Sequence, residues 1–421
     1  MSQESQATDM TQKPELLAPA GDAERLHMAV EYGADAVYLG GKVFSMRAGP
    51  ENFTPPGLAE ATAFAHARGV KVYLTCNTLP RNEEIELLPQ FLTEAAQAKV
   101  DALIVTDLGV LAYAGRYAPG VELHVSTQAG IVNYDAANAC FELGAKRVVL
   151  ARELSLAEIA QIRRNTPVSL ELEAFVHGSM CVSFSGRCLL SSYLTGRDAN
   201  RGDCAQPCRW SYALMEEKRP GQYFPVVEDA AGTHILSSRD LCMIGHIPEL
   251  VSAGVSSFKI EGRGKSAYYT AAVTNAYRIA IDDFFAHRGD YAFDTRLLEE
   301  VQKVSHREYC TGFYFGPIQN GQDYSEQSYL RSWDIAAIVE RSEGGTAFCR
   351  QRNRFAQGDG AEVLEPGGLS RPVTIGELRD ENGERVAEAL HPDMKIAVGL
   401  PFDPKPFSII RRKTEDNTKL C

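Results

Sequence analysis

The sequence predicts an α/β protein: an eight-stranded parallel β/α (TIM-like) barrel followed by a small antiparallel β-barrel domain. Over the first two-thirds of the chain, short runs rich in β-branched residues alternate with amphipathic helical segments, which is typical of a parallel sheet. Eight such runs can be counted, the number that closes a barrel. None is followed by a Gly-x-Gly-x-x-Gly turn, which argues against an open dinucleotide-binding sheet.

Local signals mark where each helix ends and each strand begins. In the first helix, Asp22 can cap the start, Glu24 suits the first turn, and Gly33 stands where a left-handed C-terminal residue belongs. A β-branched and aromatic run follows at once, and the same pattern recurs along the chain. The predicted strands are Glu15–Pro19, Ala36–Gly40, Lys71–Asn77, Ala102–Asp107, Glu122–Gln128, Arg147–Glu153, Leu170–Gly178 and Ser256–Gly262.

After the barrel, Ser266 is predicted to cap a long helix over residues 267–286. From Trp333 onward, short alternating stretches separated by Gly and Asp-Gly turns indicate a small antiparallel β-barrel, followed by the basic segment Arg411-Arg412-Lys413. The expected organisation is a tail at 1–13, a catalytic barrel at 14–330 with a cysteine-bearing insertion at 181–242, a β-barrel domain at 331–412 and a tail at 413–421.

Composition limits the class of protein. The chain has 421 residues, 44% of them hydrophobic and 23% charged, which is the balance of a globular protein with a filled core. No apolar run approaches twenty residues and the start lacks the features of a signal peptide, so no membrane span and a cytoplasmic location are expected. A net charge of −12 argues against generic binding to nucleic acid and leaves room for a local basic site.

Four cysteines form the sharpest pattern, Cys181-x6-Cys188-x15-Cys204-x3-Cys208, with Cys242 further on. All five fall between the seventh and eighth predicted strands, over the face where barrel enzymes carry their chemistry. Thiolates bind soft metals, and four of them can hold zinc or an iron–sulfur cluster. Spacing alone leaves both metals open, with unliganded thiols as a third reading.

Polar residues also gather at the carboxyl ends of the predicted strands, where barrel active sites lie. For any one of them, a structural cap or an internal ion pair at the barrel rim is the alternative reading. The candidates are Asn77, Gln128, Arg152, Glu153, His177, Lys259, Glu261 and Arg263.

Several runs resemble the collagenase-like peptidase family U32. The densest is Glu173-Ala-Phe-Val-His-Gly-Ser-Met-Cys181-Val-Ser-Phe-Ser-Gly-Arg-Cys188. The resemblance covers residues 14–285 densely and the C-terminal module loosely. Other matching runs are Glu15-Leu-Leu-Ala-Pro-Ala-Gly21, Tyr32-Gly-Ala-Asp-Ala-Val-Tyr38, His124-Val-Ser-Thr-Gln128, Gly202-Asp-Cys-Ala-Gln-Pro-Cys-Arg-Trp210 and Lys259-Ile-Glu-Gly-Arg263.

The resemblance implies a function other than the family name suggests. Better-understood members are oxygen-independent hydroxylation factors that carry a 4Fe–4S cluster on four cysteines. One branch acts in ubiquinone synthesis, one modifies ribosomal RNA, and one hydroxylates the wobble uridine of tRNA with prephenate as the oxygen source. The Gly-x-Cys-x3-Cys-Arg-Trp element and its lead-in from Arg197 resemble the tRNA branch. The implied ligands are Cys181, Cys188, Cys204 and Cys208, with Cys242 in reserve because some relatives take a ligand from that region.

The expectation is therefore an enzyme that converts wobble uridine to 5-hydroxyuridine, with tRNA and a small anionic co-substrate, prephenate, as partners. A donor with two carboxylates needs cationic partners, for which Arg is well suited. A peptidase, as the family name says, and a non-catalytic iron–sulfur RNA-binding or assembly factor are the alternatives; neither HExxH nor Gly-x-Ser-x-Gly is present for the former. Expected catalytic residues are Arg152, Glu153, His177 and Glu261, and expected substrate-binding residues are Arg47, Asn77, Gln128, Lys259 and Arg263.

Overall fold

The computed structural model describes residues 12–46, 52–181, 183, 188–197, 203–207, 214–215, 223–224, 227–229, 232–234, 239–316 and 329–414. Eight parallel strands close into a barrel, because β13 pairs in parallel with β1 on one side and with β7 on the other. The predicted parallel barrel is confirmed. In order around the barrel its strands are β13 (Ser257–Ile260), β1 (Glu15–Pro19), β2 (Ala36–Gly40), β3 (Lys71–Cys76), β4 (Ala102–Val105), β5 (Glu122–Val125), β6 (Arg147–Val149) and β7 (Glu171–Ser179).

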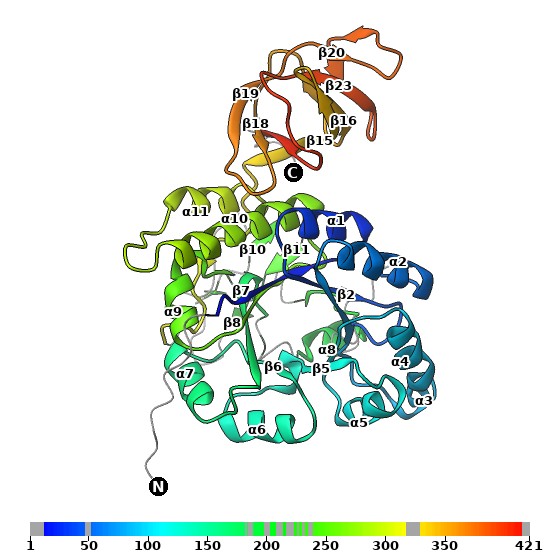
Figure 1. Ribbon diagram of the computed structural model, residues 1–421, viewed down its shortest axis with the longest axis vertical. Coiled ribbons are helices and arrows are strands. Elements are labelled where there is room, and N and C mark those ends of the chain that lie inside the picture. The colour runs from blue at the N-terminus through cyan, green and yellow to red at the C-terminus, as the bar shows by residue number, and fades with distance from the viewer. Residues whose placement is uncertain are drawn as a thin grey trace.

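Helices surround the strands (Figure 1). The predicted caps are present: the Asp22 carboxylate accepts from the amide of Arg25 at 2.8 Å, and the Ser266 hydroxyl accepts from the amide of Tyr269 at 3.1 Å. None of the helices in the described ranges is both long and apolar enough to cross a membrane. The helices are α1 (Ala23–Glu31), α2 (Pro55–His66), α3 (Asn82–Ile85), α4 (Leu88–Gln97), α5 (Leu108–Tyr117), α6 (Tyr134–Glu142), α7 (Leu156–Arg164), α8 (Leu190–Thr195), α9 (Ile247–Ser252), α10 (Ala267–Ala286) and α11 (Thr295–Gln302).

Two short strands that the sequence did not predict extend the sheet beyond the barrel. β12 (Asp240–Cys242) pairs antiparallel with β7, and β14 (Tyr309–Cys310) pairs in parallel with β12. A buried ion pair joins them: the Arg307 guanidinium lies 3.0 Å from the Asp240 carboxylate, and each side chain is 2% exposed. Strands of two or three residues are too short to show a hydrophobic period.

The C-terminal part is an eight-stranded antiparallel sheet domain, as predicted. The last strand of the domain, β24, contains Arg411-Arg412-Lys413 and pairs with both β15 and β18, so it ends one residue beyond the expected boundary at 412. Ile409 and Ile410, the first two residues of this strand, are apolar and fully buried. In sheet order the strands are β19 (Arg371–Thr374), β18 (Gly360–Leu364), β24 (Ile409–Lys413), β15 (Trp333–Glu343), β16 (Thr346–Gln351), β23 (Lys395–Gly399), β20 (Leu378–Arg379) and β21 (Arg385–Val386).

The C-terminal sheet domain is docked on the barrel beside α1, α10 and α11 through buried polar contacts (Figure 1). Arg411, whose side chain is 0% exposed, lies 2.6 Å from the Glu300 carboxylate of α11 and 2.8 Å from the Glu362 carboxylate of β18. The Tyr32 hydroxyl, at the end of α1, donates to the carbonyl of Leu364 at 3.0 Å. A charge with no access to water therefore joins the two domains.

Replacing Arg411 by Met should destabilise the protein, because it leaves Glu300 buried without its main counter-charge. The expected loss in free energy of unfolding is about 3 kcal/mol, the lower end for a broken buried pair, since Lys303 also pairs with both carboxylates. Urea denaturation measures it. Arg385→Met, which breaks a pair at a guanidinium that is 72% exposed, is the control and should cost about 0–1 kcal/mol. Equal losses in the two variants would contradict the proposed role of Arg411.

Candidate functional site

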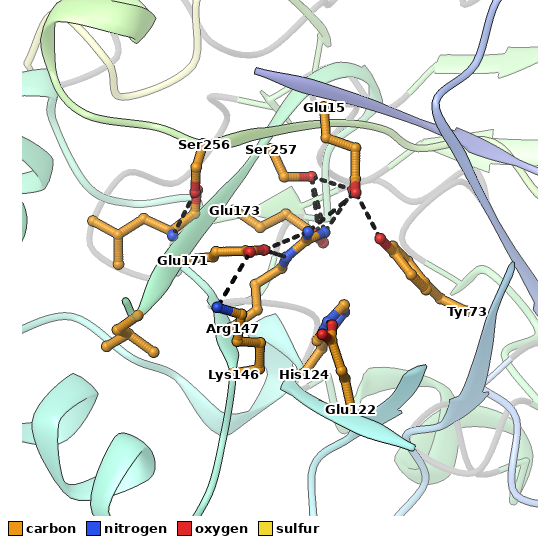
Figure 2. Close-up of polar contacts among 12 residues, drawn as sticks. Glu15, Tyr73, Glu122, His124, Lys146, Arg147, Glu171, Glu173, Ser256 and Ser257 are labelled. Atoms are coloured by element: carbon orange, nitrogen blue, oxygen red, sulfur yellow. Dashed lines mark hydrogen bonds and ion pairs between the residues drawn. The ribbon is translucent and has the colours of Figure 1, made fainter. Parts of the chain in front are cut away.

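One ion-pair lattice inside the barrel is centred on Arg147 of β6 (Figure 2). Its guanidinium donates to carboxylates of Glu15 at 2.6 Å, Glu171 at 2.6 Å and Glu173 at 2.9 Å. The Tyr73 hydroxyl donates to Glu15 at 2.6 Å. Because Glu15, Arg147 and Glu171 begin their strands, this lattice lies toward the amino ends of the strands, away from the face where barrel enzymes act.

Lys259 of β13 belongs to this lattice. Its ammonium group donates to Glu173 at 2.7 Å and lies 4.7 Å from the ring centre of Tyr38, and the residue is 4% exposed. Burial alone would raise the pKa of Glu173, but the charges of Lys259 and Arg147 outweigh it and lower that pKa to about 2. Lys259 thus has an internal ion-pair partner, the arrangement that the sequence left open as the alternative to a contact with substrate.

Arg152, three residues after β6, lies at the carboxyl end of the barrel. Its Nη1 donates to the carbonyl of Ser179 at 2.9 Å, and its guanidinium carbon lies 4.0 Å from the ring centre of Phe175. Its Nη2 is 3.8 Å from the Glu261 carboxylate, so two of the expected catalytic residues do meet here. A cation backed by an aromatic ring can receive an anion at this face.

Arg263 reaches across the other side of the same end of the barrel. Its Nη1 donates to the hydroxyls of Ser45 at 2.8 Å and Thr75 at 3.0 Å, and the residue is 6% exposed. Sequence reasoning missed both hydroxyls, since Ser45 and Thr75 lie about two hundred residues from Arg263 in the chain. They hold the guanidinium in one orientation above β2 and β3.

Asn77 and Gln128 are joined by a residue that sequence reasoning also missed. The Thr106 hydroxyl donates to the carbonyl of Asn77 at 3.1 Å and lies 3.4 Å from the Gln128 amide oxygen. The Asn77 side chain accepts from the amide of Met46 at 3.1 Å, which ties down the segment after β2. Glu153, which follows Arg152 in the chain, is half-buried. Arg47 lies outside the described residues.

His177 near the end of β7 is enclosed rather than presented to substrate. Tyr277 and Tyr309 place their hydroxyls 3.4 Å from Nδ1 and 3.3 Å from Nε2, and the residue is 1% exposed. Burial lowers the pKa of His177 to about 3, so the ring is neutral at physiological pH. The expected catalytic role of His177 therefore gains no support from its surroundings, which instead assign it to packing between β7, α10 and β14.

The Cys181 thiol lies within electrostatic range of Cys188 and Cys204, two further predicted metal ligands. Partial burial raises the pKa of the Cys181 thiol, a hydrogen bond from the Ser183 amide and the charge of Arg152 act in the opposite direction, and Cys188 and Cys204 raise it further. The Cys188 sulfur accepts from the amide of Leu190 at 3.4 Å, and the Cys204 sulfur accepts from the amide of Gln206 at 3.3 Å. Each described sulfur of the motif thus receives a backbone N–H two residues on.

These thiols do not form a finished metal site by themselves. Within the described ranges no three His, Cys, Asp or Glu side chains come together in metal-binding geometry. Cys208 lies outside those ranges. Cys242 is placed differently: it stands opposite His177 in the sheet, burial raises its pKa to about 12, and the thiol it interacts with is Cys310.

The fold and the site define a β/α-barrel protein that carries cationic side chains at the carboxyl end of its strands, with a thiol group beside them. Residues 21–323 match the model of peptidase family U32, and residues 331–411 match the model of the peptidase family U32 C-terminal domain. The chain belongs to peptidase family U32.

Relatives in this family carry different kinds of name. A Bacillus subtilis protein called tRNA hydroxylation protein P1 is 37% identical, and the match covers 96% of this chain and 96% of that protein. The Escherichia coli protein called tRNA hydroxylation protein P is 35% identical over 93% of this chain and 94% of its own length. A Porphyromonas gingivalis protein called collagenase is 35% identical over 72% of this chain and 73% of its own length.

Glu173 should make the stability of the protein sensitive to acid. Its folded-state pKa of about 2 lies below the ordinary value of 4.5, so the unfolded chain binds more protons between those two values. Its contribution is complete above pH 4.5 and is lost as the pH falls toward 2. The free energy of unfolding, measured in urea from about pH 6 to about pH 3, should therefore fall less steeply for Glu173→Gln than for the wild type. The exposed Glu142→Gln should keep the wild-type slope; a wild-type slope in Glu173→Gln would refute the lattice assignment.

Proposed function

We propose that this chain is a tRNA-modifying enzyme that hydroxylates the wobble uridine to 5-hydroxyuridine without molecular oxygen, using a 4Fe–4S cluster and prephenate as the oxygen donor. The observation that carries the proposal is the end-to-end similarity to two bacterial tRNA hydroxylation proteins, which spans both the barrel and the C-terminal sheet domain. The arrangement of thiols and guanidinium groups at one end of the barrel supports it.

The thiols fit an iron–sulfur cluster in three respects. Cys181 lies within electrostatic range of Cys188 and Cys204, and each of the three sulfurs accepts a backbone N–H, the kind of hydrogen bond that stabilises a thiolate and tunes a cluster. None of the described cysteines forms a disulfide, so their thiols can bind a metal. We assign the fourth ligand to Cys208, which stands in one motif with Cys204, and the separate surroundings of Cys242 favour that choice over Cys242. Such a cluster would supply one-electron chemistry.

The guanidinium groups fit an anionic donor. Prephenate carries two carboxylates, and Arg152 and Arg263, whose guanidinium groups can bind a carboxylate through two N–H donors, both lie where the strands end. We do not assign donor binding to Lys259, because its ammonium group is paired with the Glu173 carboxylate inside the barrel. The two arginines would hold the donor at the open end of the barrel, beside the thiols.

Peptidase activity is the alternative that the collagenase relative raises. A serine peptidase needs a base beside its nucleophile. Ser179 lies two residues from His177, but both ring nitrogens of His177 face tyrosine hydroxyls, and its pKa of about 3 makes it a weak base. A non-catalytic iron–sulfur RNA-binding factor would differ from the proposed enzyme in producing no modified nucleoside with purified components.

The protein prepared without oxygen should be brown and contain about four iron and four sulfide per chain. Alanine at Cys181, Cys188, Cys204 or Cys208 should remove most of the colour, because a missing thiolate exposes one iron. Cys242→Ala, the control, should keep it. Zinc without iron would overturn the cluster assignment, and bleaching by Cys242→Ala but not by Cys208→Ala would move the fourth ligand.

The function is tested by the nucleosides of tRNA from cells that lack this protein: 5-hydroxyuridine and its derivatives should be missing and should return with the wild-type gene. Arg152→Ala and Arg263→Ala should not restore them while still binding iron, since each loses a contact to a carboxylate worth about 2–5 kcal/mol. A Lys replacement should rescue in part, because it keeps the charge and loses the fork.

The exposed Arg164→Ala of α7 is the control for these variants and should restore modification fully. Unchanged nucleosides in the deletion strain would reject the proposed function. Full restoration by both Arg152→Ala and Arg263→Ala would reject the donor pocket. If a variant loses both its iron and its modification activity, that arginine has a structural role instead.

A further inference from the structure

The guanidinium of Arg263 is anchored at one nitrogen by two neutral groups. Its Nη1, which carries two hydrogens, donates to the Ser45 hydroxyl at 2.8 Å and to the Thr75 hydroxyl at 3.0 Å. The two hydroxyl oxygens lie 2.9 Å apart, and the Thr75 hydroxyl donates to the carbonyl of Leu39 at 3.1 Å. Because Thr75 gives its hydrogen to Leu39, its oxygen faces Arg263 and Ser45 as an acceptor. The direction of each hydrogen bond is therefore fixed.

These hydroxyls hold the guanidinium without cancelling its charge. Lys259 shows the other arrangement, since its ammonium group is held by the Glu173 carboxylate at 2.7 Å. A cation anchored by a carboxylate forms a neutral pair and attracts a second anion weakly. A hydroxyl group carries no net charge, so the cation that it anchors can still attract an anionic ligand.

The position of Arg263 also requires that Gly40, the last residue of β2, has no side chain. A Cβ atom at this position would lie 2.2 Å from Nη1 of Arg263 and 2.5 Å from the hydroxyl oxygen of Ser45. Both distances are too short for atoms that are not bonded, so any larger residue would displace the guanidinium. Gly40, Ser45 and Thr75 together form a hydroxyl socket for Arg263.

A strained turn brings Ser45 to the hydroxyl socket. Phe44 has a φ of +58°, a left-handed conformation that is unfavourable for an aromatic residue. Its carbonyl accepts from the amide of Asn77 at 2.9 Å, and the side-chain oxygen of Asn77 accepts from the amide of Met46 at 3.1 Å. Asn77 thus binds the residues on both sides of Ser45. Strain of this kind persists only where the surroundings hold it, and it is concentrated at functional sites.

We propose that Ser45 and Thr75 are positioning residues for donor binding: they fix the Arg263 guanidinium in the orientation that receives a carboxylate of the donor, and Asn77 acts by holding Ser45. The inference rests on the proposed function and adds three residues to its donor site. A mobile arginine side chain loses rotational freedom when it binds a ligand, whereas an anchored one has lost that freedom on folding. Donor affinity therefore depends on two hydroxyl groups that act through Arg263.

The test is titration calorimetry with prephenate on the full-length protein prepared without oxygen. Thr75→Val keeps the size of the side chain and removes the hydroxyl, so binding should weaken about tenfold, the effect of one lost hydrogen bond to a charged group. Thr75→Ser returns the hydroxyl and should restore most of the affinity. Ser45→Ala should weaken binding by a similar factor, which decides the matter even if Thr75→Val does not fold. Gly40→Ala should also weaken it, because the added methyl group displaces Nη1.

Two further measurements separate positioning from a general loss of structure. In Thr75→Val and Ser45→Ala, affinity for tRNA at one stated salt concentration should stay at the wild-type value, and saturating prephenate should restore the rate of modification. The matched control is Thr62→Val in α2. Thr62 is 1% exposed and its hydroxyl donates to the carbonyl of Leu58 at 2.8 Å, so the control removes a similar buried hydroxyl from a helix outside the barrel. It should leave prephenate binding unchanged.

Wild-type affinity for prephenate in both Thr75→Val and Ser45→Ala, when Arg263→Ala has lost it, would overturn the positioning role and leave the proposed function standing. An equal loss in Thr62→Val, or a loss of tRNA affinity together with prephenate affinity, would also overturn it, because the effect would then be a general one. If the wild type does not bind prephenate, or Arg263→Ala binds it fully, the donor site of the proposed function fails and the positioning role fails with it.

Discussion

The fold depends on one buried guanidinium. Arg147 binds carboxylates from β1 and β7, which are neighbours of β13 on opposite sides, and so it braces the place where the barrel closes. Charges removed from water are stable only when every partner is in place, so Glu15, Glu173 and Lys259 hold one another as a set. The lattice lies toward the amino ends of the strands, so the carboxyl ends are the face left for chemistry in a barrel of this kind. The interior lattice thereby decides where the site must lie.

The same physical device recurs at the domain boundary. Arg411 satisfies Glu300 and Glu362 without access to water, as Arg147 satisfies its glutamates inside the barrel. A small sheet held by such a contact has a defined orientation, because an ion pair of this kind tolerates little displacement before a charge is left buried and unpaired. The C-terminal sheet domain therefore has a fixed position on the barrel and is not a flexibly linked domain.

Sequence reasoning predicted the elements well and their partners poorly. The eight strands, the Asp22 and Ser266 caps and the antiparallel C-terminal sheet follow from signals within a few residues, which a single sequence contains. The buried contacts of Arg411 were not predicted, because its partners Glu362 and Glu300 lie 49 and 111 residues away in the chain. For Lys259 the sequence left both substrate binding and an internal ion pair open, because Glu173, with which it pairs, lies 86 residues away in the chain. Residue types at strand ends are visible in a sequence, but which of them neutralise one another is decided by the closed barrel.

The pairing of β7 with β12 has a consequence for the chain between them. Ser179 and Asp240 are partners in the sheet, so the segment that contains the cysteine motif leaves and re-enters the fold at one point. For a loop whose ends are already joined, each doubling of length costs only about 0.6 kcal/mol of closure entropy. Insertions and deletions there should be nearly invisible to the stability of the barrel. A longer or shorter segment could therefore follow β7 on the same barrel.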